Sequence, residues 1–120
     1  MCVGVDTSGS VSTDELKEFM NEIHHMHKTG HKITVVQCDT QITSIEEFNP
    51  KKDWGIKGRG GTSFQPVIDH YNKKRAYTAL IYLTDGEAYS PENCPKNTLW
   101  VHSSQCRINE ELPGLRIQLN

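Results

Sequence analysis

The sequence predicts a three-layer α/β domain whose sheet is mostly parallel, with one antiparallel edge strand. Segments rich in β-branched residues alternate along the chain with segments whose apolar residues recur every three or four positions, which indicates alternating strands and helices. Residues 78–83 form a continuous apolar run, as expected of a central parallel strand covered on both faces. Residues 32–38 and 41–48 are separated by a turn too short for a crossover helix, so the later segment should pair antiparallel at an edge.

The first helix is predicted from its start signal and its periodicity. It follows the apolar strand-like run 2–5 and a loop rich in hydroxyl groups. Ser12 and Glu15 have the spacing of a capping box, in which each side chain accepts a hydrogen bond from the backbone N–H of the other residue. Gly30 is a suitable stop for this helix. The expected apolar face comprises Leu16, Phe19, Met20, Ile23 and Met26.

The second half of the chain supplies one more helix and three more strands. A polar connection over residues 49–59 leads to a second helix, which Ser63 is predicted to cap and which carries Pro66 in its first turn. The central run 78–83 follows, and residues 97–102 and 115–119 are predicted to form the last two strands. The apolar face of the second helix comprises Phe64, Val67, Ile68 and Tyr71.

Composition and charge narrow the class of protein. The chain has 120 residues, which suits a single domain over 1–120, and its 35% hydrophobic and 23% charged residues are typical of a soluble globular protein. No apolar run approaches the roughly 20 residues of a membrane span, and no secretory signal is visible, so we expect a cytoplasmic protein. The formal net charge of -2 offers no broad attraction for nucleic acid. The cysteines show no C-x-x-C pairing and are predicted to be reduced thiols: Cys2, Cys38, Cys94 and Cys106.

Three loops with oxygen-bearing side chains are predicted to meet at one edge of the sheet. Asp6, Ser8 and Ser10 follow the first strand, Thr62 precedes the second helix, and Asp85 follows the central apolar run. Ligands of such sheets bind outside the carboxyl ends of the strands, near the point where the strand order switches, so these loops should reach the same place. Hydroxyl and carboxylate oxygens suit a hard cation, and Mg²⁺ takes few protein carboxylates and keeps several waters. The sequence therefore indicates a divalent-cation site.

These motifs resemble those of a von Willebrand factor A (VWA) domain with a metal-ion-dependent adhesion site. The similarity lies in the D-x-S-x-S loop from Asp6 to Ser10, in Thr62 after two glycines, and in Asp85 between a threonine and a glycine. The chain is also similar to the C-terminal VWA-like domain of bacterial predicted metal-dependent peptidases, over residues 37–39, 58–67, 81–86 and 99–101. Together the motifs cover nearly the whole chain and imply a Rossmann-like fold of the VWA type.

The resemblance also implies a ligand set and a function. Ser8, Ser10 and Thr62 are implied to bind the ion directly, and Asp6 and Asp85 to bind it through water. The ion is implied to be Mg²⁺, with Mn²⁺ or Ca²⁺ as alternatives, and an Asp or Glu of a partner protein is implied to complete its coordination. Family relatives imply coupling to a MoxR-type AAA+ ATPase or to a peptidase domain. The net charge and the absence of a long apolar run lead us to expect no nucleic-acid or membrane partner. The chain is shorter than typical members, and it lacks an H-E-x-x-H motif, so peptidase activity does not carry over.

An enzymatic alternative starts from the same aspartates. Asp6 after the first strand and Asp85 after a later one also resemble haloacid-dehalogenase phosphatases, in which an aspartate attacks phosphorus beside Mg²⁺. That family needs a second acid two residues after the first, where this chain has Ser8. We therefore expect no catalysis, with the non-catalytic domain of a larger metallopeptidase as a further alternative.

Two other clusters remain open. Residues His24, His25, His27 and His31 have pairs at helical spacing that suit zinc or another transition metal, although a solvated helix end is the simpler interpretation. Residues Lys51, Lys52, Lys57 and Arg59 precede the Thr62 loop and suit an acidic partner, although a solvated lysine-rich connection explains them more simply.

Overall fold

The computed structural model of the protein describes residues 1–52, 55–74 and 76–120, and in this part of the chain six strands form one sheet. Residues 53 and 54 of the predicted 49–59 connection lie outside the described residues. The elements are β1 (Cys2–Asp6), α1 (Thr13–Lys28), β2 (Thr34–Cys38), β3 (Ile42–Glu47), α2 (Gln65–Lys73), β4 (Leu80–Thr84), β5 (Leu99–His102) and β6 (Leu115–Gln118). Every predicted strand and helix is present, with ends that differ by a few residues.

The strand order is β3-β2-β1-β4-β5-β6, and the predicted fold class is confirmed. β1 pairs parallel with both β2 and β4, and β4, β5 and β6 continue the parallel arrangement. β3 pairs antiparallel with β2 at the edge, as the short turn between them predicts. The chain moves outward from β1 through β2 and then returns to its other side at β4. The switch point of the sheet therefore lies between β1 and β4, where ligands of such sheets bind.

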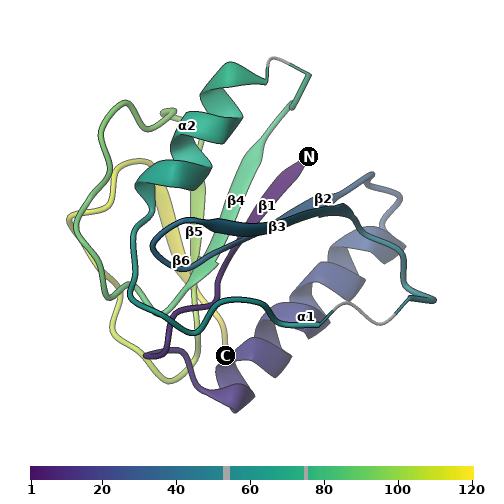
Figure 1. Ribbon diagram of the computed structural model, residues 1–120, viewed down its shortest axis with the longest axis horizontal. Helices are drawn as coiled ribbons and strands as arrows, with labels where there is room; N and C mark the ends of the chain where they lie inside the picture. Colours follow the sequence, from purple (N-terminus) through teal and green to yellow (C-terminus); the bar gives the residue numbers. More distant parts are fainter. Residues whose placement is uncertain (53–54, 75) are drawn as a thin grey trace.

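Helix α1 covers one face of the sheet and α2 covers the other, as Figure 1 shows. The capping box that opens α1 is confirmed, because the Ser12 hydroxyl accepts from the Glu15 N–H and the Glu15 carboxylate accepts from the Ser12 N–H. Gly30 follows the C-cap with φ +94°, a conformation that glycine adopts at little cost. The helix is thus bounded at both ends by local chemistry that the sequence contains.

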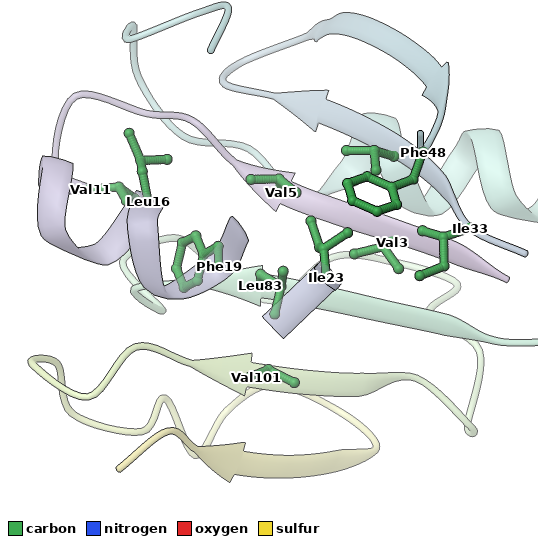
Figure 2. Packing of buried hydrophobic residues seen from close by; sticks show 11 residues of the cluster. Val3, Val5, Val11, Leu16, Phe19, Ile23, Ile33, Phe48, Leu83 and Val101 are labelled. Carbon is green, nitrogen blue, oxygen red and sulfur yellow. The ribbon is translucent and has the colours of Figure 1, made fainter. Parts of the chain in front are cut away.

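The α1 face of the core confirms the predicted apolar stripe. Leu16, Phe19 and Ile23 point from α1 toward side chains of β1 and β4, such as Val5 and Leu83, as Figure 2 shows. Met20 and Met26 are partly buried and pack against the same cluster. Burying a side chain such as Leu, Ile or Phe contributes about 1.5–3 kcal/mol each, so this face anchors α1 to the strands that end at the switch point.

On the opposite face, the prediction that Ser63 caps the second helix is wrong. The N-cap of α2 is Phe64, which makes no side-chain capping bond, while Pro66 lies in the first turn as predicted. The reason is tertiary: the Ser63 N–H donates to the Asp39 carbonyl at 2.8 Å, and Phe64 is buried against Tyr82 and Trp100. Packing of a large aromatic residue therefore decides where this helix begins, ahead of the local capping preference.

The cysteines, the exposure of the edge strand β6 and the character of the helices complete the description of the fold. All four cysteines are free, and burial raises the pKa of the Cys2 and Cys38 thiols to about 12, as expected of core thiols. β6 is exposed along its length, with Leu115 at 66% and Ile117 at 46% exposure. No helix in the described residues is long and apolar enough to cross a membrane.

Candidate cation site at the switch point

The carboxyl ends of β1 and β4 bring two acidic loops together. Val5 of β1 is in register with Leu83 of β4, so Asp6 and Thr84 follow side by side. The Thr84 hydroxyl donates to Asp6 Oδ2 at 2.7 Å and fixes one oxygen of that carboxylate. Thr84 also accepts from the N–H of Gly86 at 3.0 Å, which turns the chain directly after Asp85. Asp6 therefore lies at the centre of the predicted switch point, where it is bonded to the end of β4.

Asp6 is fully buried, and its second oxygen is held by its own loop. Oδ1 accepts from the Ser8 N–H at 3.0 Å and from the Ser8 hydroxyl at 2.6 Å. Burial raises the pKa of Asp6 to about 6, while the hydrogen bonds from Ser8 and Thr84 lower it and the nearby charge of Asp85 raises it further. The site therefore carries a carboxylate in a setting that disfavours negative charge.

Two serine hydroxyls lie next to each other between the two carboxylates. Ser10 Oγ donates to Asp85 Oδ2 at 2.6 Å, and Ser8 Oγ lies 3.1 Å from Ser10 Oγ. A hydroxyl has one proton and two lone pairs, and each serine uses its proton on a carboxylate. When both carboxylates are ionised, these two bonds use both hydroxyl protons and leave none for the contact between the two hydroxyl oxygens. Ser8 and Ser10 therefore present lone pairs at close range, an arrangement that a cation stabilises.

The loop that carries Thr62 is fastened to the first loop through backbone contacts. The Gly9 N–H donates to the Gly60 carbonyl at 2.8 Å, and the Arg59 N–H donates to the Thr7 carbonyl at 2.8 Å. Thr62 itself is half-buried, and no hydrogen bond among the described residues joins its hydroxyl to Ser8 or Ser10. Four of the five predicted residues thus form one hydrogen-bonded group, and Thr62 lies in a loop fixed beside them.

Asp39 holds the Thr62 loop from the β2 side. Its Oδ2 accepts from the Gly60 N–H at 3.2 Å, and its carbonyl accepts from the Ser63 N–H at 2.8 Å. Desolvation raises the pKa of the Asp39 carboxyl, but several backbone N–H donors, those of Gln41 and Gly60 among them, together outweigh it and leave the pKa below its usual value. Gly58 has φ +124°, and a Cβ there would lie 2.5 Å from the Thr7 hydroxyl. Only glycine fits where this loop passes Thr7, directly after the end of β1.

Among the described residues, no basic side chain pairs with the buried carboxylates of this region. Asp6, Asp85 and Glu15 are 0%, 4% and 6% exposed. The one ion pair in residues 1–52, 55–74 and 76–120 joins Lys32 to Glu47 on the surface, at 3.5 Å. Buried charges are normally paired or bound to metals, because an unpaired charge is costly to desolvate. Hydroxyl and carboxylate oxygens without a basic partner fit a hard divalent cation.

A comparison with known protein families identifies the relationship. The family described as VWA-like domain (DUF2201) matches residues 1–119. This chain belongs to that family. An uncharacterized protein of Thermotoga maritima is 33% identical over 90 residues, which cover 72% of this chain and 23% of that protein. The chain thus spans less than a quarter of that relative. No solved structure shows a significant match. A VWA-like domain suggests a protein-interaction or adhesion-type module.

The histidine cluster of the VWA-like domain is partly built into its core. His24 and His27 lie edge-on to the Phe48 ring, at 5.0 and 5.2 Å between centroids. No group of three His, Cys, Asp or Glu side chains in the described part of the chain is arranged to hold a metal ion. The candidate cation site would not form such a group, because most of its expected ligands are hydroxyl groups. Lys51, Lys52, Lys57 and Arg59 are exposed, and their attraction for an acidic partner stays a prediction.

Several residues that shape the site of the VWA-like domain were not predicted from sequence. Thr84 and Asp39 lie within stretches that resemble the family, but their bonds to Asp6 and to Gly60 cross between elements. Ser103 and Asn109 belong to the loop between β5 and β6, which has no periodic pattern. Asn109 donates through its side chain to the carbonyls of Gly86 and Ala88, at 2.9 and 3.1 Å, and so holds the loop after Asp85.

Proposed function

We propose that this VWA-like domain is a divalent-cation-dependent protein-binding module that recognises an Asp or Glu of a partner protein. The observation that carries the proposal is the 3.1 Å contact between the Ser8 and Ser10 hydroxyl oxygens, whose protons are both directed to carboxylates. Their lone pairs converge beside two buried acids that lack a basic partner in the described residues. A bound cation would satisfy all four groups at once.

The ligand set follows the chemistry of these groups. Ser8, Ser10 and Thr62 would bind the cation directly, and Asp6 and Asp85 would hold its bound waters. Mg²⁺ suits such an oxygen site, with Mn²⁺ or Ca²⁺ as alternatives. Neutral hydroxyl ligands leave the ion with most of its positive charge, so it would attract a carboxylate of a partner strongly in a poorly hydrated site. Ser10 and Asp85 also line an open groove, through which a partner would approach the ion.

A binding role is favoured over phosphoryl transfer by the state of Asp6. This carboxylate is 0% exposed and both of its oxygens accept hydrogen bonds, from Ser8 and Thr84, so it is held as a structural acceptor. A nucleophile needs a free oxygen directed at the substrate. We therefore propose a module without catalytic activity, located in the cytoplasm. Its partner would be a MoxR-type AAA+ ATPase, or a peptidase domain of a longer protein.

Calorimetric titration of the chain with Mg²⁺ tests the cation site. The Ser8→Ala/Ser10→Ala variant should lose binding by at least about tenfold, because it removes two of the proposed ligands. Ser90 is exposed, so Ser90→Ala is a matched control that should bind as the natural chain does. Equal Mg²⁺ binding by the natural chain and a Ser8→Ala/Ser10→Ala/Thr62→Ala variant would refute this site.

The partner is tested by cofractionation from the native host with Mg²⁺ and with EDTA. A protein that binds through the cation should be lost in EDTA and in the Ser8→Ala/Ser10→Ala variant, and should remain with Ser90→Ala. An interaction that persists in EDTA would show that recognition does not use the cation.

A further inference from the structure

Glu15 uses its two carboxylate oxygens in different ways. Oε1 accepts from the Ser12 N–H at 3.0 Å and completes the capping box of α1. Oε2 accepts from the hydroxyl of Ser103, 88 residues later in the chain. Glu15 is 6% exposed, and its bond to Ser103 is buried whereas its bond to Ser12 is only partly buried. A capping box needs only one oxygen at this position, and glutamine serves there as well. The second bond therefore calls for a separate explanation.

Ser103 connects Glu15 to the end of β4, directly before Asp85. The Ser103 N–H donates to the Thr84 carbonyl at 3.1 Å, directly before Asp85. Its own carbonyl accepts from the Gln118 side chain at 3.1 Å, which ties the same residue to β6. Glu15 thus links the first turn of α1, which directly follows the Ser10 loop, to the end of β4. This link is independent of the direct bond between Ser10 and Asp85.

The groove beside the site shows that this link belongs to the same region. Ser10, Glu15 and Asp85 line it together, and so they surround one opening. Two bonds join the Ser10 loop side to the Asp85 side. The bond between Ser10 Oγ and Asp85 Oδ2, at 2.6 Å, is partly buried, and the bond between Glu15 and Ser103 is buried. If the inner link is lost, the outer bond alone must hold the two loops at the correct distance.

We propose that Glu15 is a positioning residue of the cation site, which sets Mg²⁺ affinity by holding the Ser10 loop against the Asp85 loop through Ser103. The inference rests on the proposed cation-binding function. Mg²⁺ requires near-ideal octahedral geometry at about 2.0–2.1 Å, and sites of this kind must be held within about 0.5 Å. A modest separation of Ser10 from Asp85 therefore lowers affinity while the fold survives.

Four variants separate positioning from helix capping and from charge. Glu15→Ala and Ser103→Ala each remove the link, and each should raise the Kd for Mg²⁺ by about tenfold or more, the usual effect of losing a group that orients metal ligands. Glu15→Gln should stay within about threefold of the natural chain, because its amide keeps the cap and donates to the Ser103 hydroxyl. Ser12→Ala is the matched control: it weakens the helix cap by about 1 kcal/mol and should leave the Kd unchanged.

Amide hydrogen exchange in metal-free protein gives a second measurement. The Glu87 N–H donates to Asp85 Oδ1 at 3.1 Å, so its exchange reports on the position of that carboxylate. Ser103→Ala should accelerate exchange at Glu87, and Ser12→Ala should not. Because Ser103→Ala leaves the capping box intact, it decides the question even where Glu15→Ala does not fold.

Three results contradict the inference in distinguishable ways. An unchanged Kd in Ser103→Ala shows that the link is only structural, and a Glu15→Gln variant as weak as Glu15→Ala shows that charge, not position, matters. Both results leave the cation site itself in place. A natural chain that binds no Mg²⁺ overturns the proposed function and this inference together.

Discussion

The Thr84 side chain holds the buried Asp6 carboxylate in place and contributes to stability. Its hydroxyl is a hydrogen-bond donor to Asp6 Oδ2 and an acceptor for the Gly86 N–H. Thr84→Val keeps the shape but leaves the Asp6 oxygen and the Gly86 N–H without partners. We expect a loss of about 1–3 kcal/mol in the free energy of unfolding, measured by urea denaturation. Thr78 is exposed, so Thr78→Val should stay within about 0.5 kcal/mol. Similar effects of the two changes would contradict this role of Thr84.

His102 gives the metal-free domain a predictable response to pH. It is fully buried, its Nδ1 lies 3.2 Å from the Ile117 carbonyl, and its Nε2 accepts from the Asn109 N–H at 3.1 Å. Both nitrogens are therefore satisfied in the neutral ring, with the proton on Nδ1. Burial lowers the pKa of His102, and the charge of Arg116 lowers it further. Below the unfolded value of about 6.5 the unfolded chain binds more protons, so stability should fall as pH decreases toward the lowered folded pKa.

Comparison with His102→Gln isolates this effect. The raised pKa of Asp6, about 6, acts in the opposite direction, since the folded state binds more protons there and gains stability as pH falls from about 6 toward 3.8. That contribution is common to both proteins and cancels in their difference. Urea unfolding at pH 7.5 and 5.5, with EDTA present, should show the natural chain losing more stability than the variant. A parallel pH dependence in the two proteins would exclude His102 as the titrating group.

At this scale, the sequence predicted the residues that act within one loop. Asp6, Ser8 and Ser10 form a local pattern, and the structure places them in one hydrogen-bonded group with Asp85. The bond between Glu15 and Ser103 spans 88 residues and joins a capping residue to an irregular loop. No local pattern contains that information, because the bond depends on how β5 is placed beside β4.

The two helices differ in how far local chemistry determines them. Ser12 caps α1 as predicted, with its side chain and backbone both engaged by Glu15 of the same helix. Ser63 does not cap α2, because its backbone is already bonded to Asp39 and the neighbouring Phe64 must reach the core. Capping motifs therefore predict a helix start well where no tertiary contact competes for the same residues.

The path of the Thr62 loop requires a glycine at position 58. Gly58 has φ +124°, and a Cβ there would lie 2.5 Å from the Thr7 hydroxyl and 3.2 Å from Asp39 Oδ2. Gly58→Ala should therefore cost about 1–3 kcal/mol in unfolding free energy and displace Thr62, which weakens Mg²⁺ binding as well. A Cβ at Gly55 would meet no described atom within 4 Å, so Gly55→Ala is the matched control and should change neither property. Urea unfolding and Mg²⁺ titration of both variants would test this. A Gly58→Ala variant with unchanged stability and unchanged Mg²⁺ affinity would contradict the role of Gly58.

Over the whole molecule, the alternation of strand and helix patterns was enough to predict the sheet. The antiparallel edge followed from loop length alone, and the family match over residues 1–119 agrees with the single layered fold. The uneven cover of the sheet was not predicted. Leu112 of the β5–β6 connection is buried on the α2 side, while Leu115 and Ile117 of β6 stay exposed. Irregular connections show no periodicity, so the sequence alone does not predict which face of the sheet they cover.

Cation binding at the switch point should stabilise the whole molecule, because β1, β4 and the Thr62 loop meet only in the folded state. At a hundredfold excess of Mg²⁺ over its Kd, linkage adds about 2.7 kcal/mol, which raises the Tm by roughly 10 °C for a domain of this size. Thermal unfolding with Mg²⁺ and with EDTA measures the shift. The Ser8→Ala/Ser10→Ala variant should show none, and Ser90→Ala should show all of it. A rise of equal size in the double variant would mean that Mg²⁺ binds elsewhere, since the convergent hydroxyl pair of the site is then gone.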